Sequence, residues 1–185
     1  MFNGMSKAEV EMKCDIAAEL CLNAGAEDVF LCNTDERKDA VWSVLAATLE
    51  AIKASTTDSD ECDIVVPRNK IADMVKLCDV KSREYGIRAV ISGHAGDGNT
   101  HIQLCRDDLP VEEFEERLPK MVRELFAQAK IMGGQVSGEH GIGHAKAEYL
   151  AEFMGEDVLR LYRGIKLAFD DRYILNPGKV IAMNK

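Results

Sequence analysis

All four histidines of the chain lie in two glycine-rich segments, which are therefore the first candidates for chemistry. The segment GHAGDGNTH carries His94 and His101, and the segment SGEHGIGH carries His140 and His144. A neutral imidazole binds divalent transition metals, and it also transfers protons near neutral pH. Glycine allows positive φ and lets other groups approach the backbone closely. The pattern predicts that the two segments meet to form a metal site.

The first segment is predicted to be the turn of a β-hairpin. If residues 96–99 form the turn, His94 and His101 stand opposite one another, and such side chains share a face about 5 Å apart. Two neutral imidazoles at that separation form a chelate. The letters GDGN on their own indicate only an ordinary turn, so the metal hypothesis depends on the two flanking histidines.

The second segment supplies a carboxylate, Glu139, next to His140. Two histidines and one carboxylate leave coordination positions open for substrate and water, which is typical of catalytic metal sites. Glu139 is therefore the predicted third ligand. His140 is a candidate for proton transfer, with a hydrogen-bonded structural histidine as the alternative. Gly141 and Gly143 disfavour a helix here, and the HExxH order of zinc proteases is absent. His144 is interpreted as a helix-start or ligand-supporting residue, or as a surface histidine.

Helical and strand patterns alternate along the chain and must position these segments. Helices are expected over 6–24, from about 35 onward, over 69–85, up to 131, and over 144–153 and 156–170, and strands over 26–33, 62–67, 87–92 and 100–105. The last two strands must form an antiparallel hairpin because the connection between them is too short for a parallel crossover. This favours the α+β class over a doubly wound parallel sheet.

The apolar positions of the predicted helices identify the faces that should be buried. These positions are Val41, Leu45, Leu49 and Ile52 in the second helix, and Ile71, Val75 and Cys78 in the third. Gly86 is expected to end the third helix in a left-handed conformation. Pro119 is expected to kink or split the helix that ends near residue 131.

The composition indicates one soluble globular domain of 185 residues, 46% of them hydrophobic and 30% charged. The net charge of −9 argues against a nucleic-acid or anionic-membrane partner. No stretch approaches the ~20 apolar residues of a membrane span, and the N-terminus lacks the apolar core of a signal peptide, which favours the cytoplasm. None of the six cysteines forms a CxxC pair, so a thiolate zinc site or an iron–sulfur cluster is poorly supported.

The order of the elements indicates that residues 1–185 are a piece of a longer protein. The chain opens directly on a helix, and the strand that a two-layer α+β unit would place before that helix is missing. A complete small protein is the alternative.

Three motifs, GHAGDGNTH, GGQVSGEHGIGHAK and ILNPGKVI, resemble in this order the C-terminal domain of FAD-linked oxidases. This family includes glycolate oxidase, D-lactate dehydrogenase and D-2-hydroxyglutarate dehydrogenase, and the resemblance covers roughly residues 6–182. It implies a ferredoxin-like α+β fold, possibly duplicated, with an antiparallel sheet covered by helices. It also implies an N-terminal FAD-binding domain that residues 1–185 lack.

The resemblance implies a role for each candidate residue. His94, His101 and Glu139 match metal ligands. His140 matches a histidine at the substrate that is a candidate base, and Asn176 returns toward the flavin. The implied reaction oxidises a 2-hydroxy acid to a 2-oxo acid. A divalent ion (zinc, iron or manganese) lowers the pKa of the hydroxyl, and FAD accepts the hydride. An electron-transferring flavoprotein, an iron–sulfur subunit or a quinone would then reoxidise the flavin.

Three positions depart from patterns that occur among relatives. Leu45 stands where many carry arginine, Glu61 where some carry lysine, and Gln103 where some carry asparagine. The first two differences remove cations that would hold a substrate carboxylate. A monocarboxylate such as lactate or glycolate therefore fits better than a dicarboxylate such as 2-hydroxyglutarate.

Two other functions are compatible with the same ligands. One is a stand-alone metal-binding or assembly module that docks on a flavoprotein. The other is a small metal-dependent hydrolase, which ranks lower because no further nucleophile or oxyanion motif appears in the sequence.

Overall fold

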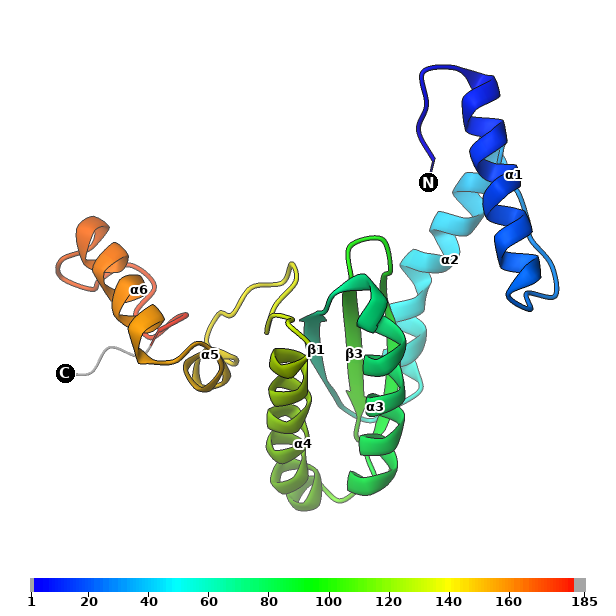
Figure 1. The fold of residues 1–185 in the computed structure, drawn as a ribbon. Helices are drawn as coiled ribbons and strands as arrows, with labels where there is room; N and C mark the ends of the chain where they lie inside the picture. The colour runs from blue at the N-terminus through cyan, green and yellow to red at the C-terminus, as the bar shows by residue number, and fades with distance from the viewer. Residues whose placement is uncertain (1, 182–185) are drawn as a thin grey trace. The chain divides into compact units, whose positions relative to one another are not determined.

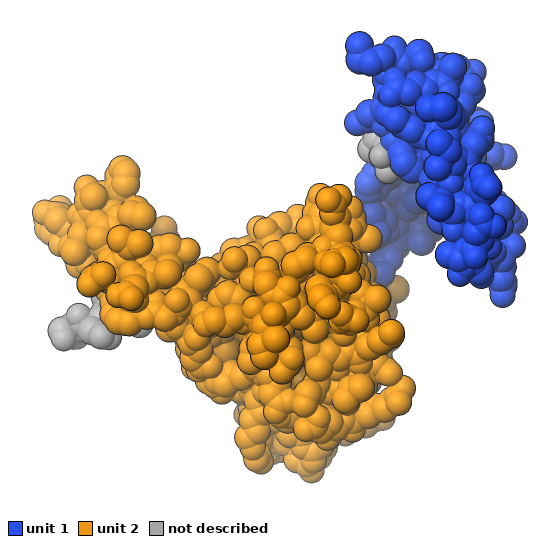
Figure 2. Space-filling model, viewed as in Figure 1, with its two compact units in different colours: residues 1–50 blue, residues 51–185 orange. Residues whose placement is uncertain are grey.

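The computed structural model describes residues 2–181, and the chain divides into two compact units, residues 1–50 and 51–185 (Figure 2). The first unit contains α1 (Lys7–Asn23) and most of α2 (Asp35–Ala54). Ser6 begins α1 as predicted, because its hydroxyl accepts a hydrogen bond from the backbone N–H of Glu9 at 3.2 Å.

Two predictions about the N-terminal part are wrong. Residues 26–33 form an irregular connection, because none of the described strands pairs with them and an isolated strand is not stable. The expected inner face of α2 is exposed at Val41, Leu45 and Leu49, and only Ile52 is buried. The apolar spacing does produce a helix. Burial of one face also requires a packing surface, which the described residues of the first unit do not supply.

The second unit is built on a three-stranded antiparallel sheet with strand order β1-β3-β2 (Figure 1). Its elements in chain order are β1 (Ser59–Val65), the 3-10 turn η1 (Arg68–Lys70), α3 (Ile71–Tyr85), β2 (Arg88–His94), β3 (Asn99–Cys105) and α4 (Val111–Ile131). Beyond α4, Gln135 forms an isolated antiparallel bridge with Val65 of β1. The succession βαββα, followed by this further pairing, is the order of a ferredoxin-like unit and confirms the predicted fold class. Residues 2–181 contain one such sheet, so they do not include a duplicate of it.

One side of the sheet packs on α3 and α4, and the other carries the candidate site. Alternate residues of a strand point to opposite faces. The buried cluster includes Cys62, Ile64, Ile102 and Leu104 from the sheet, Met74 and Cys78 from α3, and Phe114, Met121 and Leu125 from α4. Asp63 and His101 alternate with these apolar positions and therefore point to the opposite face. The helices thus fix the sheet without covering the site.

The helices that cover the sheet correct two further expectations. Pro119 does not split α4, which is continuous, because its inner face holds six buried apolar side chains. Their packing outweighs the ~3 kcal/mol that an internal proline costs. In α3 the buried positions are Met74 and Cys78, whereas Val75 is exposed. Gly86 ends α3 in the left-handed region with φ of 66°, as predicted.

The C-terminal part returns to the second glycine-rich segment. After α5 (Ala147–Met154) and α6 (Glu156–Phe169), the backbone N–H of Val180 donates to the carbonyl of Gly143 at 2.6 Å. Nδ1 of His144 lies 3.3 Å from the carbonyl oxygen of Gly178. Among residues 2–181, no helix has both the length and the apolar character that a bilayer span requires.

Candidate metal centre

The first glycine-rich segment is a hairpin turn, but its register differs from the prediction. His94 pairs with Asn99, and His101 pairs with Ser92, so the two histidines are diagonal neighbours rather than direct partners. The backbone N–H groups of Asp97 and Gly98 both donate to the carbonyl of His94, at 2.9 and 3.1 Å, which closes the turn one residue earlier in the chain than expected. Diagonal side chains on one face remain within reach of each other. The imidazole centroids are 5.4 Å apart, with an interplanar angle of 89°.

Asp63 of β1 holds the second glycine-rich segment over the sheet. Its side chain is fully buried, and Oδ2 accepts hydrogen bonds from the Ser137 hydroxyl at 2.9 Å and the Gly138 N–H at 3.0 Å. The backbone N–H groups of Glu139 and His140 donate to the same oxygen at 2.8 and 2.7 Å. Burial raises the pKa of the Asp63 carboxyl, but the hydrogen bonds from His140, Glu139 and Ser137 outweigh it and lower the pKa to about 2. Asp63 is therefore an anion at neutral pH.

Glu139 reaches both histidines of the hairpin. Its Oε1 lies 3.0 Å from Nε2 of His101 and 3.3 Å from Nε2 of His94. Asn99 donates to the same oxygen at 3.1 Å. Donors bound to one ion at about 2.1 Å stand roughly 3.0–3.4 Å apart in octahedral or tetrahedral geometry, so this spacing fits a divalent metal. His101 is mostly buried, while His94 and Glu139 are half exposed, which leaves one side of the group open.

The other nitrogen of His101 faces two carboxylates. Its Nδ1 is buried without a hydrogen bond, 3.4 Å from Glu61 Oε1 and 3.9 Å from Asp63 Oδ1. Asp63 Oδ1 is likewise buried without a hydrogen bond. Histidines that bind metals usually donate their second ring N–H to a carboxylate or carbonyl. A proton on Nδ1 suits this side of the ring and leaves the lone pair of Nε2 for an ion.

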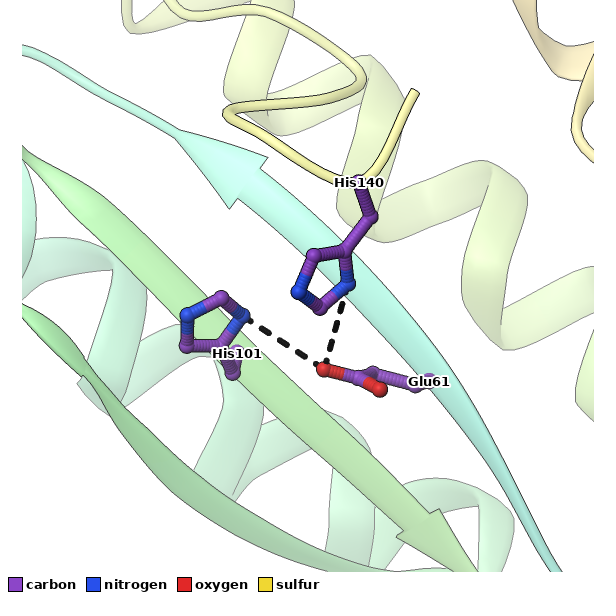
Figure 3. A group of neighbouring side chains, drawn as sticks. All are labelled: Glu61, His101 and His140. Carbon is purple, nitrogen blue, oxygen red and sulfur yellow. Dashed lines mark ion pairs between the residues drawn. The ribbon is translucent and has the colours of Figure 1, made fainter. Parts of the chain in front are cut away.

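A second group of possible ligands combines Glu61, His101 and His140 (Figure 3). Glu61 Oε1 lies 3.4 Å from Nδ1 of His101 and 3.5 Å from Nδ1 of His140. The two imidazoles are stacked, with centroids 4.8 Å apart and an interplanar angle of 18°. An ion lies near the plane of every imidazole that binds it, and two stacked planes cannot both contain one ion. The perpendicular rings of His94 and His101 have no such conflict, so His94, His101 and Glu139 are the better set of candidate ligands.

Two residues of the site, Glu61 and Asp63, were not predicted as functional. Their sequence signal is a pair of carboxylates at alternate positions of the strand that contains CDIVV. An acidic residue inside an otherwise apolar strand indicates a buried, hydrogen-bonded carboxylate. Two predicted residues lie apart from the ligand group. His144 contacts the tail at Gly178, and Asn176 lines a shallow apolar pocket beside α6.

The fold and the site define a class of protein: a ferredoxin-like α+β unit that places two histidines and a glutamate on the open face of its sheet. The sequence matches the family described as FAD linked oxidases, C-terminal domain, over residues 1–180. The chain belongs to this family.

Three curated relatives illustrate the similarity. The chain is 44% identical over 179 residues to a D-lactate dehydrogenase of Anaerostipes hadrus, which is 97% of this chain and 38% of that protein. It is 34% identical over 173 residues to the glycolate oxidase subunit GlcD of Bacillus subtilis, covering 94% and 37%. It is 36% identical over 165 residues to a D-lactate dehydrogenase of Archaeoglobus fulgidus, covering 89% and 36%. The chain thus spans less than two-fifths of the length of each of these relatives.

Proposed function

We propose that residues 1–185 form the substrate- and metal-binding part of an FAD-dependent 2-hydroxy-acid dehydrogenase or oxidase. The observation that carries this proposal is the convergence of Glu139 Oε1 on Nε2 of His101 at 3.0 Å and Nε2 of His94 at 3.3 Å. The names of the relatives, D-lactate dehydrogenase and glycolate oxidase subunit, support a 2-hydroxy acid as the substrate. In this proposal the FAD is bound mainly by an N-terminal domain of the same protein.

Each residue of the site has its own role in the proposed oxidation. His94, His101 and Glu139 would hold zinc, iron or manganese, which when bound lowers the pKa of the substrate hydroxyl. Bound FAD supplies the acceptor for the hydride of the α-carbon. The half-exposed His94 and Glu139 leave room for the substrate on the open side of the group. His140, stacked on His101 at 4.8 Å between centroids, takes the hydroxyl proton, and the product is a 2-oxo acid.

We assign Asn176 to the flavin side of the site. It has a positive φ of 46° in the turn of the tail. The contacts of Val180 with Gly143 and of Gly178 with His144 hold this tail against the segment that carries His140. A reduced flavin requires an electron acceptor, and an electron-transferring flavoprotein or an iron–sulfur subunit fits this requirement.

A chimeric enzyme tests the proposed function. The part of the Anaerostipes hadrus D-lactate dehydrogenase that matches this chain is replaced by residues 1–185, and oxidation of D-lactate and glycolate is followed with a dye acceptor. We expect the chimera to turn over, and the chain alone with added FAD to show no turnover. Substitution His140→Ala should lower kcat by roughly 10²- to 10⁴-fold, because proton transfer to a positioned base contributes that much.

The matched control for this experiment is Asp79→Ala, which removes an exposed side chain of α3, on the side of the sheet opposite the candidate site, and should leave kcat unchanged. A chimera that binds FAD and metal but oxidises no 2-hydroxy acid would contradict the proposal and favour the stand-alone metal-binding module. Turnover by the isolated chain with FAD would show that it needs no FAD-binding domain.

Substrate charge gives a second prediction. Glu61 Oε1 lies 3.5 Å from Nδ1 of His140, so a second carboxylate of the substrate would meet an anion at the site. We expect kcat/KM of the chimera for D-lactate or glycolate to exceed that for 2-hydroxyglutarate by at least about 10-fold, since like charges side by side cost several kcal/mol. Glu61→Gln should narrow this ratio mainly through KM for the dicarboxylate. Equal kcat/KM values for both substrate classes in the unmodified chimera would contradict the prediction.

A further inference from the structure

Glu61 lies between the two stacked histidines and outside the proposed ligand group. It is on β1, two residues before Asp63, and its side chain is partly exposed. Oε1 faces Nδ1 of His101 at 3.4 Å and Nδ1 of His140 at 3.5 Å (Figure 3). Within residues 2–181, neither carboxylate oxygen of Glu61 accepts a hydrogen bond of ordinary length. One oxygen of this carboxylate therefore faces two imidazole nitrogens, and the second oxygen remains available for a hydrogen bond.

The chemistry of a carboxylate decides which ring nitrogen carries the proton. An ionised carboxylate only accepts hydrogen bonds, so a neutral imidazole that turns Nδ1 toward it is stabilised with the proton on Nδ1. The distances of 3.4 and 3.5 Å are longer than a hydrogen bond. A rotation of the carboxylate that offers one oxygen to each ring would close both contacts.

In each of the two stacked rings, the nitrogen that does not face Glu61 points in the same direction. Figure 3 shows that the second ring nitrogens of His101 and His140 are both directed away from Glu61. For His101 this nitrogen is Nε2, which lies 3.0 Å from Glu139 Oε1. Because the stacked rings both turn Nδ1 toward Glu61, Nε2 of His140 points to the same side as Nε2 of His101, where the proposed metal site lies (Figure 3).

The two histidines differ in how many carboxylates they face. His101 has Asp63 Oδ1 at 3.9 Å as well as Glu61. Among the described residues, Glu61 is the one carboxylate at ion-pair distance from the ring of His140, and Asp63 interacts with this ring electrostatically from a greater distance. Removal of Glu61 therefore leaves the His140 ring without a carboxylate at ion-pair distance, whereas Nδ1 of His101 still has Asp63.

From these contacts we infer that Glu61 is a positioning residue for His140. It holds the proton of the neutral ring on Nδ1, and it leaves the lone pair of Nε2 free on the side where the substrate hydroxyl would bind. The role of His140 as the base rests on the proposed function, but the tautomer itself does not. Glu61 thus orients the proton acceptor without touching the substrate hydroxyl.

The tautomers are measured in the ¹⁵N-labelled chain without metal. Long-range ¹H–¹⁵N spectra at pH about 8, above the ordinary imidazole pKa near 6.5, distinguish a protonated Nδ1 from a protonated Nε2. The His140 signals are assigned by comparison with His140→Ala. We expect the Nδ1–H tautomer at His140, its loss in Glu61→Ala, and its retention in Glu61→Gln, whose amide oxygen still accepts a hydrogen bond. His101 should keep its tautomer in every variant because Asp63 remains. The control is Asp60→Ala, which removes the adjacent, exposed carboxylate of β1.

Kinetics of the chimera give the second readout. Glu61→Ala should lower kcat for D-lactate by roughly 10- to 100-fold, the range seen when a histidine loses its supporting carboxylate, and Glu61→Gln should restore most of it. An Nε2–H tautomer at His140 in the unmodified chain, or an Nδ1–H tautomer that persists in Glu61→Ala, would overturn the inference whatever the activity. If the tautomers behave as expected and the chimera is inactive, the positioning role stands and only the proposed function fails.

Discussion

Substitution of His101 by alanine is expected to lower the affinity of the chain for Zn²⁺ by at least about 100-fold. Loss of a residue that merely supports a ligand already costs 10- to 100-fold in affinity, and His101 is proposed as a ligand itself. Its Nε2 lies 3.0 Å from Glu139 Oε1, and its ring has only 14% of its side-chain surface exposed, so no other side chain can take its position without rearrangement. Isothermal titration of the chain with Zn²⁺ measures the effect.

The structure offers two comparisons for this titration. Glu139→Gln should also weaken binding, because it removes the anionic ligand and leaves both imidazoles in place. His144→Ala removes a histidine that contacts the tail at Gly178, and it should leave the affinity unchanged. Equal affinities of His101→Ala and His144→Ala would mean that His94, His101 and Glu139 do not bind the ion.

Substitution Asp63→Asn is expected to destabilise the second unit by roughly 2–4 kcal/mol, because hydrogen bonds to charged groups contribute about 1.5–3 kcal/mol each and an amide replaces them only in part. Four donors of the segment 137–140 converge on Asp63 Oδ2 in the unmodified chain. For a chain of this size the loss corresponds to a decrease in Tm of roughly 5–15 °C. Thermal unfolding followed by circular dichroism measures it, with Asp60→Asn, an exposed neighbour on β1, as the control.

The destabilisation caused by Asp63→Asn should become smaller as the pH falls. The pKa of Asp63 is lowered to about 2 in the folded chain, below its ordinary value near 3.9. The resulting stabilisation, roughly 2 kcal/mol, is fully present above about pH 4 and is lost as the pH falls through about 2. The difference in unfolding free energy between the unmodified chain and Asp63→Asn should therefore shrink between pH 5 and 2. A difference that stays constant over this interval would show that the Asp63 charge does not contribute.

The placement of the two hairpin histidines was predictable even though the register was not. The predicted pairing of His94 with His101 differs from the observed pairing of His94 with Asn99 by two residues. A shift of two residues keeps every side chain on its face of the sheet, whereas a shift of one would have reversed it. The prediction of adjacent imidazoles therefore held although the turn lies one residue earlier in the chain than predicted.

The sequence alone determined the residue types of the site, the α+β class and the family, because these depend on local spacing and on motifs. Only the tertiary structure decided that Asp63 anchors a segment more than 70 positions later in the chain, and that Glu61 faces His140. Such contacts join residues with no periodic relation in sequence. The burial of a helix face is likewise not determined by the spacing of apolar residues in the sequence. The apolar spacing of α2 predicted a helix with an inner face, but Val41 and Leu45 are exposed, because burial depends on a partner surface that the spacing does not specify.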